Sequence, residues 1–170
     1  MAKIRKLQSN DVNKMHEWIN DYEVVRFLAI GRRKHSLEEL KGFIEKSFID
    51  TDNVYFAIEA DDGKYAGTVS LKSVNKIDLT AEYAIAIHRD YQHQGLAKFA
   101  TDEILKYGFH SIGLRKIFLN VVETNIKAIN FYEKYGFCKE AVFHKHIFIN
   151  GNFVDLIWYT IFSDKFNKEF

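Results

Sequence analysis

Gln92-His93-Gln94-Gly95-Leu96-Ala97 is the segment that decides how this chain folds, because it lies between a strand-like run and a helix-like run. The strand-like run covers residues 83–88, and the helix-like run covers residues 96–111. A small, flexible turn at such a junction directs several backbone N–H groups and the positive end of a helix toward one point. Proteins hold pyrophosphate in this way. We therefore expect a phosphate-bearing ligand at this turn.

Two common phosphate-binding motifs are absent from the chain. A Walker loop needs GxxxxGK followed by Ser or Thr, and a dinucleotide fold needs GxGxxG followed by an acidic residue. The chain instead has Gln-x-x-Gly-x-Ala at 92–97 and, further on, the segment NIKAINFYEKYGF at 125–137. Together these resemble the GNAT superfamily of N-acetyltransferases, whose signature is Arg/Gln-x-x-Gly-x-Gly/Ala followed by Asn-x-x-Ala-x-x-x-Tyr and a Gly-Phe turn. The resemblance covers nearly the whole chain.

Residue periodicity predicts an α/β (α+β) fold. Strand-like runs at 54–60 and 65–74 flank the turn Asp61-Asp62-Gly63, and a third follows at 80–88. A helix at 95–111 before a strand at 115–122 implies a parallel pair with a right-handed crossover. Another helix at 125–135 precedes a closing hairpin, with strands 137–149 and 152–162 around Asn150-Gly151. The result is a mixed, mostly antiparallel sheet of about seven strands with helices packed on it, as in the GNAT fold.

The first third of the chain is expected to be mostly helical. A short strand at 3–7 is followed by Ser9, which we interpret as the N-cap of a first helix. A second helical piece covers 21–28, and a basic loop at 31–35 separates it from a third helix opened by Ser36. We expect residues 1–170 to form one N-acetyltransferase domain, with helices on both faces of the sheet.

Composition limits the partners and the compartment. Hydrophobic residues make up 47% of the 170 residues, which excludes a disordered chain. A net charge of +1 gives no global attraction to nucleic acid or to an anionic membrane. The chain has a single cysteine, Cys138, and neither a secretory stretch nor a membrane-spanning run, so a cytoplasmic location is the default. The histidines, including His144 and His146, lack a third ligand of the right kind, so no metal is expected.

Acetyl transfer needs a protein that holds the pyrophosphate of acetyl-CoA and polarises its thioester. The amides of 93–98 suit the pyrophosphate, Gly95 and Ala97 allow close approach, and Lys98 adds charge; the alternative is a glycine turn that merely caps a helix. The resemblance implies that strand 85–87 splays from its neighbour and pairs with the pantetheine arm; a buried central strand fits the same residues. The expected cofactor-binding residues are Ile85, Ala86, Ile87, Gln92, His93, Gln94, Gly95, Leu96, Ala97, Lys98, Asn125, Ala128 and Asn130.

Two residues are candidates for proton transfer. Tyr132 matches the family's tyrosine that protonates the leaving thiolate, although it could equally be a core aromatic. Glu82 precedes the splayed strand, where many relatives carry a carboxylate that accepts the proton of the amine; an exposed salt-bridge partner is the alternative. Asn125 matches the asparagine that contacts pantetheine and is also a candidate N-cap. With these groups, we expect the primary amine of the acceptor to attack the thioester of acetyl-CoA directly, while both substrates are bound in a ternary complex.

The sequence gives opposing indications about the acceptor. Segments such as 81–83 and 148–151 are similar to spermidine N-acetyltransferases, within a branch that also holds ribosomal-protein N-terminal and amino-sugar-nucleotide acetyltransferases. A cluster such as Arg32-Arg33-Lys34 is either a solvated surface loop or a border of the acceptor site. If it borders the site it would repel a polycation, which predicts poor activity on spermidine and favours a small molecule or peptide with negative charge. A non-catalytic acyl-CoA-binding module on the same fold is a further alternative. The apolar closing hairpin could supply the surface of a homodimer.

Overall fold

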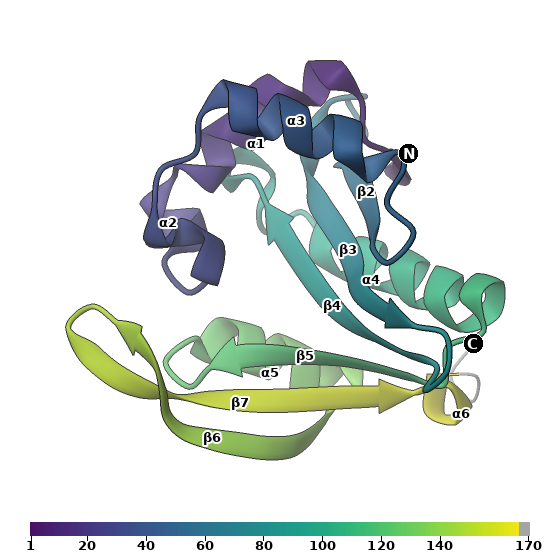
Figure 1. Cartoon of the computed structure of the whole chain (residues 1–170), viewed down its shortest axis with the longest axis vertical. Coiled ribbons are helices and arrows are strands. Elements are labelled where there is room, and N and C mark those ends of the chain that lie inside the picture. Colours follow the sequence, from purple (N-terminus) through teal and green to yellow (C-terminus); the bar gives the residue numbers. More distant parts are fainter. Residues whose placement is uncertain (167–170) are drawn as a thin grey trace.

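One mixed sheet takes strands from both halves of the chain (Figure 1). The structure is a computed structural model that describes residues 1–166, the side chain of Arg32 excepted. The strand order is β1-β2-β3-β4-β5-β7-β6, and every neighbouring pair is antiparallel except β4 and β5. This confirms the predicted mixed, mostly antiparallel sheet with one parallel pair. The strands are β1 (Lys3–Lys6), β2 (Val54–Glu59), β3 (Tyr65–Asn75), β4 (Thr80–Ile87), β5 (Lys116–Val122), β6 (Cys138–Ile149) and β7 (Asn152–Phe162).

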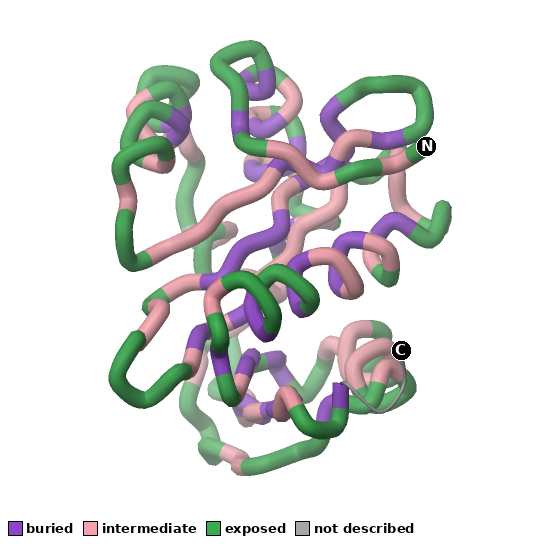
Figure 2. Tube along the Cα trace, turned by 90° about the vertical axis from the view of Figure 1, so that its right-hand side faces the viewer, coloured by how far each residue is buried: buried purple, intermediate pink, exposed green. Residues whose placement is uncertain are grey.

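Helices cover both faces of the sheet, as predicted. Neighbouring residues of a strand point to opposite faces. In β2, Ala57 belongs to the buried cluster that contains residues of the N-terminal helices, whereas Ile58 belongs to the cluster that contains residues of α4. Figure 2 shows the buried residues collected along the central strands and on the helix that packs against them. The longer helices are α1 (Val12–Ile19), α3 (Leu37–Ser47), α4 (Leu96–Lys106) and α5 (Ile126–Tyr135). The shorter helical segments are η1 (Ser9–Asp11), α2 (Tyr22–Val25), η2 (Ala29–Arg32), η3 (Arg89–Tyr91), η4 (Tyr107–Ile112, a π-helix that continues α4) and α6 (Ser163–Phe166). Within the described residues, no helix has the length and apolar character needed to cross a membrane.

The parallel strands β4 and β5 diverge soon after they begin, so a gap opens in the sheet (Figure 1). Their pairing ends at Glu82 and Phe118, whereas β5 stays paired with β7 as far as Val122. The His88 N–H donates to the Ala66 carbonyl at 2.8 Å, which fixes the alternation along β4. Residues 84, 86 and 88 therefore bond toward β3, and the N–H groups of Ile85 and Ile87 face the gap. This is the splay that the family resemblance implied.

Several local predictions are confirmed, and one is wrong. Ser36 caps α3 and forms a capping box with Glu39. Asn150 and Gly151 have φ values of 48° and 84°, as a two-residue hairpin turn requires. Ser9, however, does not cap α1: it lies in η1, and α1 begins at Val12. The reason is the buried carboxylate of Asp11, which accepts bonds from Arg5 and from the Gln8 N–H and so fixes the turn ahead of the helix.

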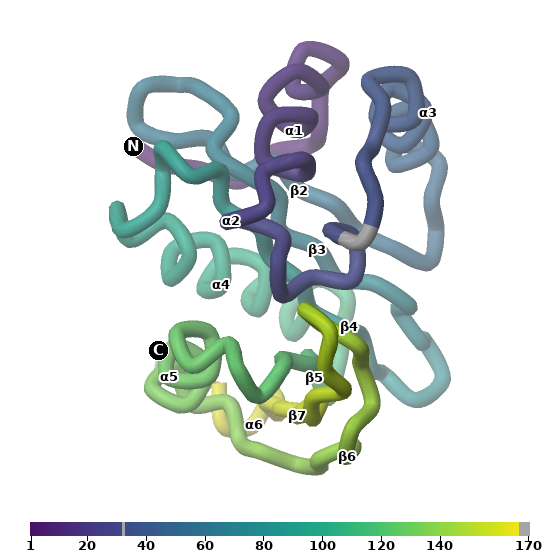
Figure 3. Tube along the Cα trace, turned by 90° about the vertical axis from the view of Figure 1, so that its left-hand side faces the viewer, coloured from purple at the N-terminus to yellow at the C-terminus, as the bar shows by residue number. Residues whose placement is uncertain are grey.

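The open end of the gap lies beside α2 and the tip of the β6–β7 hairpin. The Tyr22 hydroxyl, in α2, donates to Asn150 Oδ1 at 3.1 Å, so two elements far apart in the chain meet here. Figure 3 views the molecule from this side, with α4 and α5 together and the segment after α2 descending toward the hairpin tip. The splay thus opens toward a space that helices and hairpin enclose.

Candidate active site

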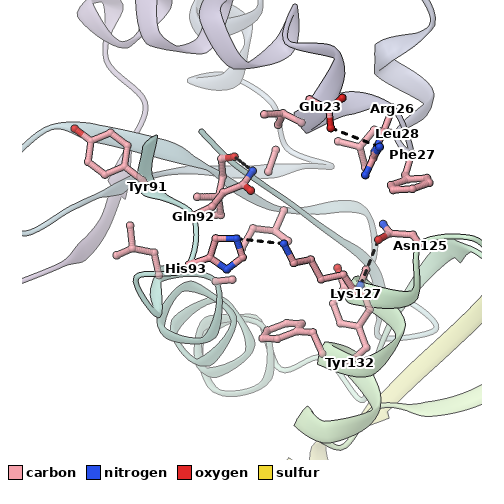
Figure 4. A pocket seen from close by; sticks show the side chains of 18 of the residues that line it. Glu23, Arg26, Phe27, Leu28, Tyr91, Gln92, His93, Asn125, Lys127 and Tyr132 are labelled. Carbon is pink, nitrogen blue, oxygen red and sulfur yellow. Dashed lines mark hydrogen bonds and ion pairs between the residues drawn. The ribbon is translucent and has the colours of Figure 1, made fainter. Parts of the chain in front are cut away.

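A cavity of about 620 Å³ occupies the gap between the end of β4, the loop before α4 and the start of α5 (Figure 4). Most of the predicted cofactor-binding residues meet in its wall, and Tyr132 joins them. Gln94 and Asn130 are not among the lining residues; Gln94 Nε2 donates instead to the Asp90 carbonyl at 2.9 Å. The predicted residues that line the cavity are Ile85, Ala86, Ile87, Gln92, His93, Gly95, Leu96, Ala97, Lys98, Asn125 and Ala128.

The loop before α4 has the geometry of an anion cradle. Gly95 has a φ of +79°, a conformation that favours glycine, and a Cβ there would meet no atom within 4 Å. Gln92 Nε2 donates to the Ile87 carbonyl at 3.2 Å and so ties the loop to the end of β4. The first N–H groups of α4 have no partner inside the helix and face the cavity together with the positive helix end. A phosphate group would satisfy these donors.

Asn125 opens α5 in the way predicted for an N-cap. Its Oδ1 accepts the Ala128 N–H at 3.3 Å, and its side chain also lines the cavity. The cap holds the first turn of α5 at the mouth of the gap, which places Lys127 and Tyr132 on the cavity side of the helix (Figure 4). Capping and contact with a ligand are compatible for this residue.

Tyr132 is both a core aromatic and a wall of the cavity. Its ring packs edge-on against Tyr83, with centroids 6.0 Å apart, and against Phe137 at 5.6 Å. Its hydroxyl makes no hydrogen bond to any residue in the described part of the chain, so it is available to a ligand. Burial raises the pKa of the Tyr132 phenol well above its ordinary value. The group is therefore protonated at neutral pH, and it is a weaker acid than the sequence suggested.

A second cavity, of about 610 Å³, lies next to the first, toward α1 and α3. The two share the β4 backbone region at Ile85 and Ala86, together with Tyr132 and two residues that follow α2, Phe27 and Leu28. A thioester at this junction would be reached from one cavity and its amine partner from the other. The arrangement fits a reaction that brings two substrates together at β4.

Glu82 lines the second cavity and not the first. It is the last residue of β4 that pairs with β5, and its side chain is 25% exposed. Lys72 Nζ lies 3.4 Å from the carboxylate, and Asn120 Nδ2 donates to it at 3.1 Å. The salt bridge that was its alternative interpretation is therefore present. The carboxylate nevertheless forms part of the wall of the second cavity.

The basic loop carries less free charge than its sequence suggests. Arg33 lines the second cavity, but its guanidinium bonds to both carboxylate oxygens of Glu39, at 2.9 and 3.1 Å. Lys34 Nζ donates to the Asn20 carbonyl at 2.7 Å. The side chain of Arg32 lies outside what the structure describes. Arg33 and Lys34 are therefore less free to repel a polycation than an unpaired basic loop would be.

Sequence reasoning missed Lys127 and the residues after α2. Lys127 lines the first cavity, and its Nζ lies 3.2 Å from His93 Nε2. Lys98, which was expected to supply the positive charge, lines the cavity but pairs with Asp102 at 2.9 Å. The position of Lys127 within the Asn-x-x-Ala motif was a usable signal. Lys127 follows the N-cap Asn125 by two residues and therefore lies in the first turn of α5, beside the cavity. Phe27 and Leu28 offered no such signal.

Comparisons with known proteins agree with this geometry. Residues 2–138 match the family described as "Acetyltransferase (GNAT) domain". The spermidine N(1)-acetyltransferase of Escherichia coli K12 is 33% identical over 168 residues, which covers 99% of this chain and 89% of that protein. The structure of spermidine N-acetyltransferase from Vibrio cholerae in complex with CoA and spermine superposes with a TM-score of 0.90 at 28% identity, covering 98% of both chains. A putative ribosomal N-acetyltransferase of Bacillus subtilis, YdaF, is 21% identical and covers 98% of this chain and 93% of its own. With the motifs, the splayed strands and these relatives in agreement, the chain belongs to the GNAT family of acetyltransferases.

Proposed function

We propose that this acetyl-CoA-dependent N-acetyltransferase binds acetyl-CoA in the first cavity and a primary amine in the second, and that a polyamine is the acceptor. The observation that carries the two-substrate arrangement is the junction of both cavities at Ile85, Ala86 and Tyr132. The similarity to spermidine acetyltransferases over nearly the whole chain supports the polyamine. Glu39 and Glu82 give the second cavity two carboxylates for a cationic acceptor.

The proposed chemistry is direct transfer. The amine nitrogen attacks the thioester carbonyl carbon, the C–N bond forms, and the C–S bond breaks. The proton of the amine goes to Glu82, directly or through water, and the Tyr132 phenol donates to the departing thiolate. The Ile85 and Ile87 N–H groups, which face the gap, suit the pantetheine arm and the thioester oxygen.

A second acceptor class, an amino-sugar nucleotide or an acidic peptide start, is favoured by one observation. Arg33 and Lys72 line the second cavity beside the two carboxylates, so the wall carries both signs of charge. An acceptor with a phosphate or carboxylate could displace Glu39 from Arg33. The polyamine takes precedence because the similarity to spermidine acetyltransferases covers nearly the whole chain.

Release of CoA thiol from acetyl-CoA with a panel of amines tests the proposal. The panel contains spermidine, spermine, an amino-sugar nucleotide and peptides with acidic or neutral first residues. We expect the highest kcat/KM with a polyamine. Preference for the nucleotide by more than tenfold would transfer the assignment to the second class, and no thiol release with any amine would contradict transferase function.

A further inference from the structure

We propose that Asn120 binds the acceptor amine beside Glu82 and turns the lone pair of the amine nitrogen toward the thioester. This inference rests on the proposed function, in which Glu82 takes the proton of that amine. Asn120 belongs to β5 and Glu82 to β4, so the two side chains meet where these strands begin to diverge (Figure 1). Both residues line the second cavity, and Asn120 Nδ2 donates to Glu82 Oε1 at 3.1 Å.

The register of the two strands places Asn120 nearer than Glu82 to the proposed site of attack. Glu82 is paired with Phe118, and the strands diverge beyond this pair. Asn120 follows Phe118 by two residues, so it lies on the same face of the sheet and about 7 Å further along β5. The amides that suit the thioester begin at Ile85, three residues or about 10 Å beyond Glu82 in the same direction. Asn120 therefore lies between the level of Glu82 and the level of the thioester.

The hydrogen bond to Glu82 fixes the orientation of the Asn120 amide. A carboxylate only accepts, so Nδ2 faces it and Oδ1, the acceptor, lies on the other branch of the amide. In the part of the chain that the structure describes, residues 1–166, no donor bonds to this oxygen. An asparagine with a structural role uses both branches: Asn53 Nδ2 donates to Asp50, and its Oδ1 accepts the Ser73 N–H. Asn120 thus keeps an acceptor for a ligand.

Glu82 also keeps one oxygen for the amine. Lys72 Nζ and Asn120 Nδ2 both contact Oε1, at 3.4 and 3.1 Å, which leaves Oε2 to receive a proton. A neutral primary amine has two N–H groups and one lone pair. When Asn120 Oδ1 accepts one N–H group and Glu82 the other, the lone pair is left to attack the carbonyl carbon.

The contact with Asn120 is stronger in the transition state than in the bound substrates. As the C–N bond forms, the nitrogen gains positive charge, and its N–H group becomes a better donor to Oδ1. An interaction that strengthens in this way raises kcat more than it lowers KM. The proton itself passes to Glu82, so Asn120 orients the amine and transfers no proton.

Thiol release with spermidine, measured across pH, tests this role. Asn120→Leu removes both polar branches of the amide at nearly constant volume. We expect kcat to fall about 10- to 100-fold, the range for one hydrogen bond to a group that gains charge, with the KM for acetyl-CoA little changed. The fall should persist at high pH, because a neutral amine still needs orientation. A residue that only held Glu82 would lose its importance at high pH, so recovery of kcat there, or an unchanged kcat, overturns the proposal.

Lys72→Met is the matched control, since it removes the other contact to Glu82 Oε1 and leaves the amide in place. Its effect on kcat should be smaller than that of Asn120→Leu and should fade at high pH. An equal and equally persistent loss in Lys72→Met would show that both residues act through the carboxylate, which contradicts the proposal. Should Asn120→Leu lower the melting temperature, Asn120→Ala repeats the measurement without adding apolar bulk.

A double-mutant cycle separates direct contact from action through Glu82. In the Glu82→Gln background, Asn120→Leu should lower kcat again by a similar factor, because it removes a contact of its own with the amine. No further loss in that background would contradict the proposal. If another amine of the panel has a higher kcat/KM than spermidine, the same variants are compared with that amine. Absence of thiol release by wild type with every amine would contradict the proposed function itself, whereas normal turnover by Asn120→Leu contradicts this inference alone.

Discussion

At the scale of single residues, the two candidates for proton transfer have surroundings that the sequence did not predict. Tyr132 is partly buried against the rings of Tyr83 and Phe137, and burial raises its pKa, while Glu82 is held by Lys72 and Asn120. A phenol of raised pKa does not ionise in the resting enzyme. In the proposed mechanism it donates as negative charge develops on sulfur, which ties its contribution to the transition state.

Tyr132→Phe should therefore lower kcat by about 10²-fold or more with little change in the KM for acetyl-CoA, because only a proton donor is lost. Steady-state rates of thiol release measure both values. Tyr159→Phe is the matched control: it removes a hydroxyl that donates to Glu133 at 2.7 Å and lies outside both cavities. It should cost about 1 kcal/mol of stability and leave kcat intact. Near-normal turnover in Tyr132→Phe would reduce this residue to its packing role.

Glu82→Gln should cause a smaller loss of kcat, and a higher pH should restore part of it. At high pH more of the amine is already neutral, so a proton acceptor in the protein matters less. The pH profile of kcat/KM in wild type and variant is the measurement. A constant ratio between them across the profile would mean that Glu82 has a structural role through Lys72 and Asn120.

At the scale of elements, the turn before α4 forms the phosphate cradle of the proposed cosubstrate site. Gly95→Glu should abolish acetyl-CoA binding, because a carboxylate would enter the phosphate cradle. Gly113→Glu is a close control, since its φ of +81° matches the +79° of Gly95 and both have open space for a Cβ. The two variants carry the same backbone strain, so a similar fall in melting temperature is expected. Calorimetry should detect acetyl-CoA binding in Gly113→Glu alone; equal binding by both would contradict the cradle.

The elements also separate what the sequence could predict from what it could not. Ser36 with Glu39, and Asn150 with Gly151, are signals contained in a few neighbouring residues, and both are confirmed. The alternation of residues along β2 and β3, and the order of the two motifs, can likewise be read directly from the sequence. Ser9 failed as a cap because its competitor, the Arg5–Asp11 ion pair, joins a strand to a turn. Pairing of Arg33 with Glu39, and the contact of α2 with the hairpin tip, depend on the assembled fold, so no short pattern predicts them.

At the scale of the whole molecule, buried phenols link stability to alkaline pH. Burial is the main cause that raises the pKa values of Tyr65, Tyr83 and Tyr132 above 10.0. Below pH about 10 these phenols are protonated whether or not the chain is folded, so stability is unaffected. Above it the unfolded chain releases protons that the folded chain retains, and stability falls until the folded-state pKa values are passed.

Urea unfolding should therefore show little change in stability from pH 8 to about pH 9.5 and a steep fall above pH about 10, with up to about 1.4 kcal/mol lost per pH unit for each buried phenol. Tyrosinate absorbance recorded in the same samples should show these phenols ionising together with unfolding. Tyr83→Phe, in which one such phenol is absent, should have a shallower slope. An equally steep slope in that variant would assign the alkaline loss to other groups.

Successive N–H groups of β4 alternate between bonding to β3 and facing the gap, and this alternation should be visible in their rates of amide hydrogen exchange. In the free protein the amides of Ala84 and Ala86 bond to β3 and should exchange slowly, whereas those of Ile85 and Ile87 face the gap and should exchange fast. A pantetheine arm bonded along this edge would slow the second pair and leave the first nearly unchanged. Successive residues of one strand would then report the two states of the enzyme, and the cosubstrate would serve as the strand that the sheet lacks.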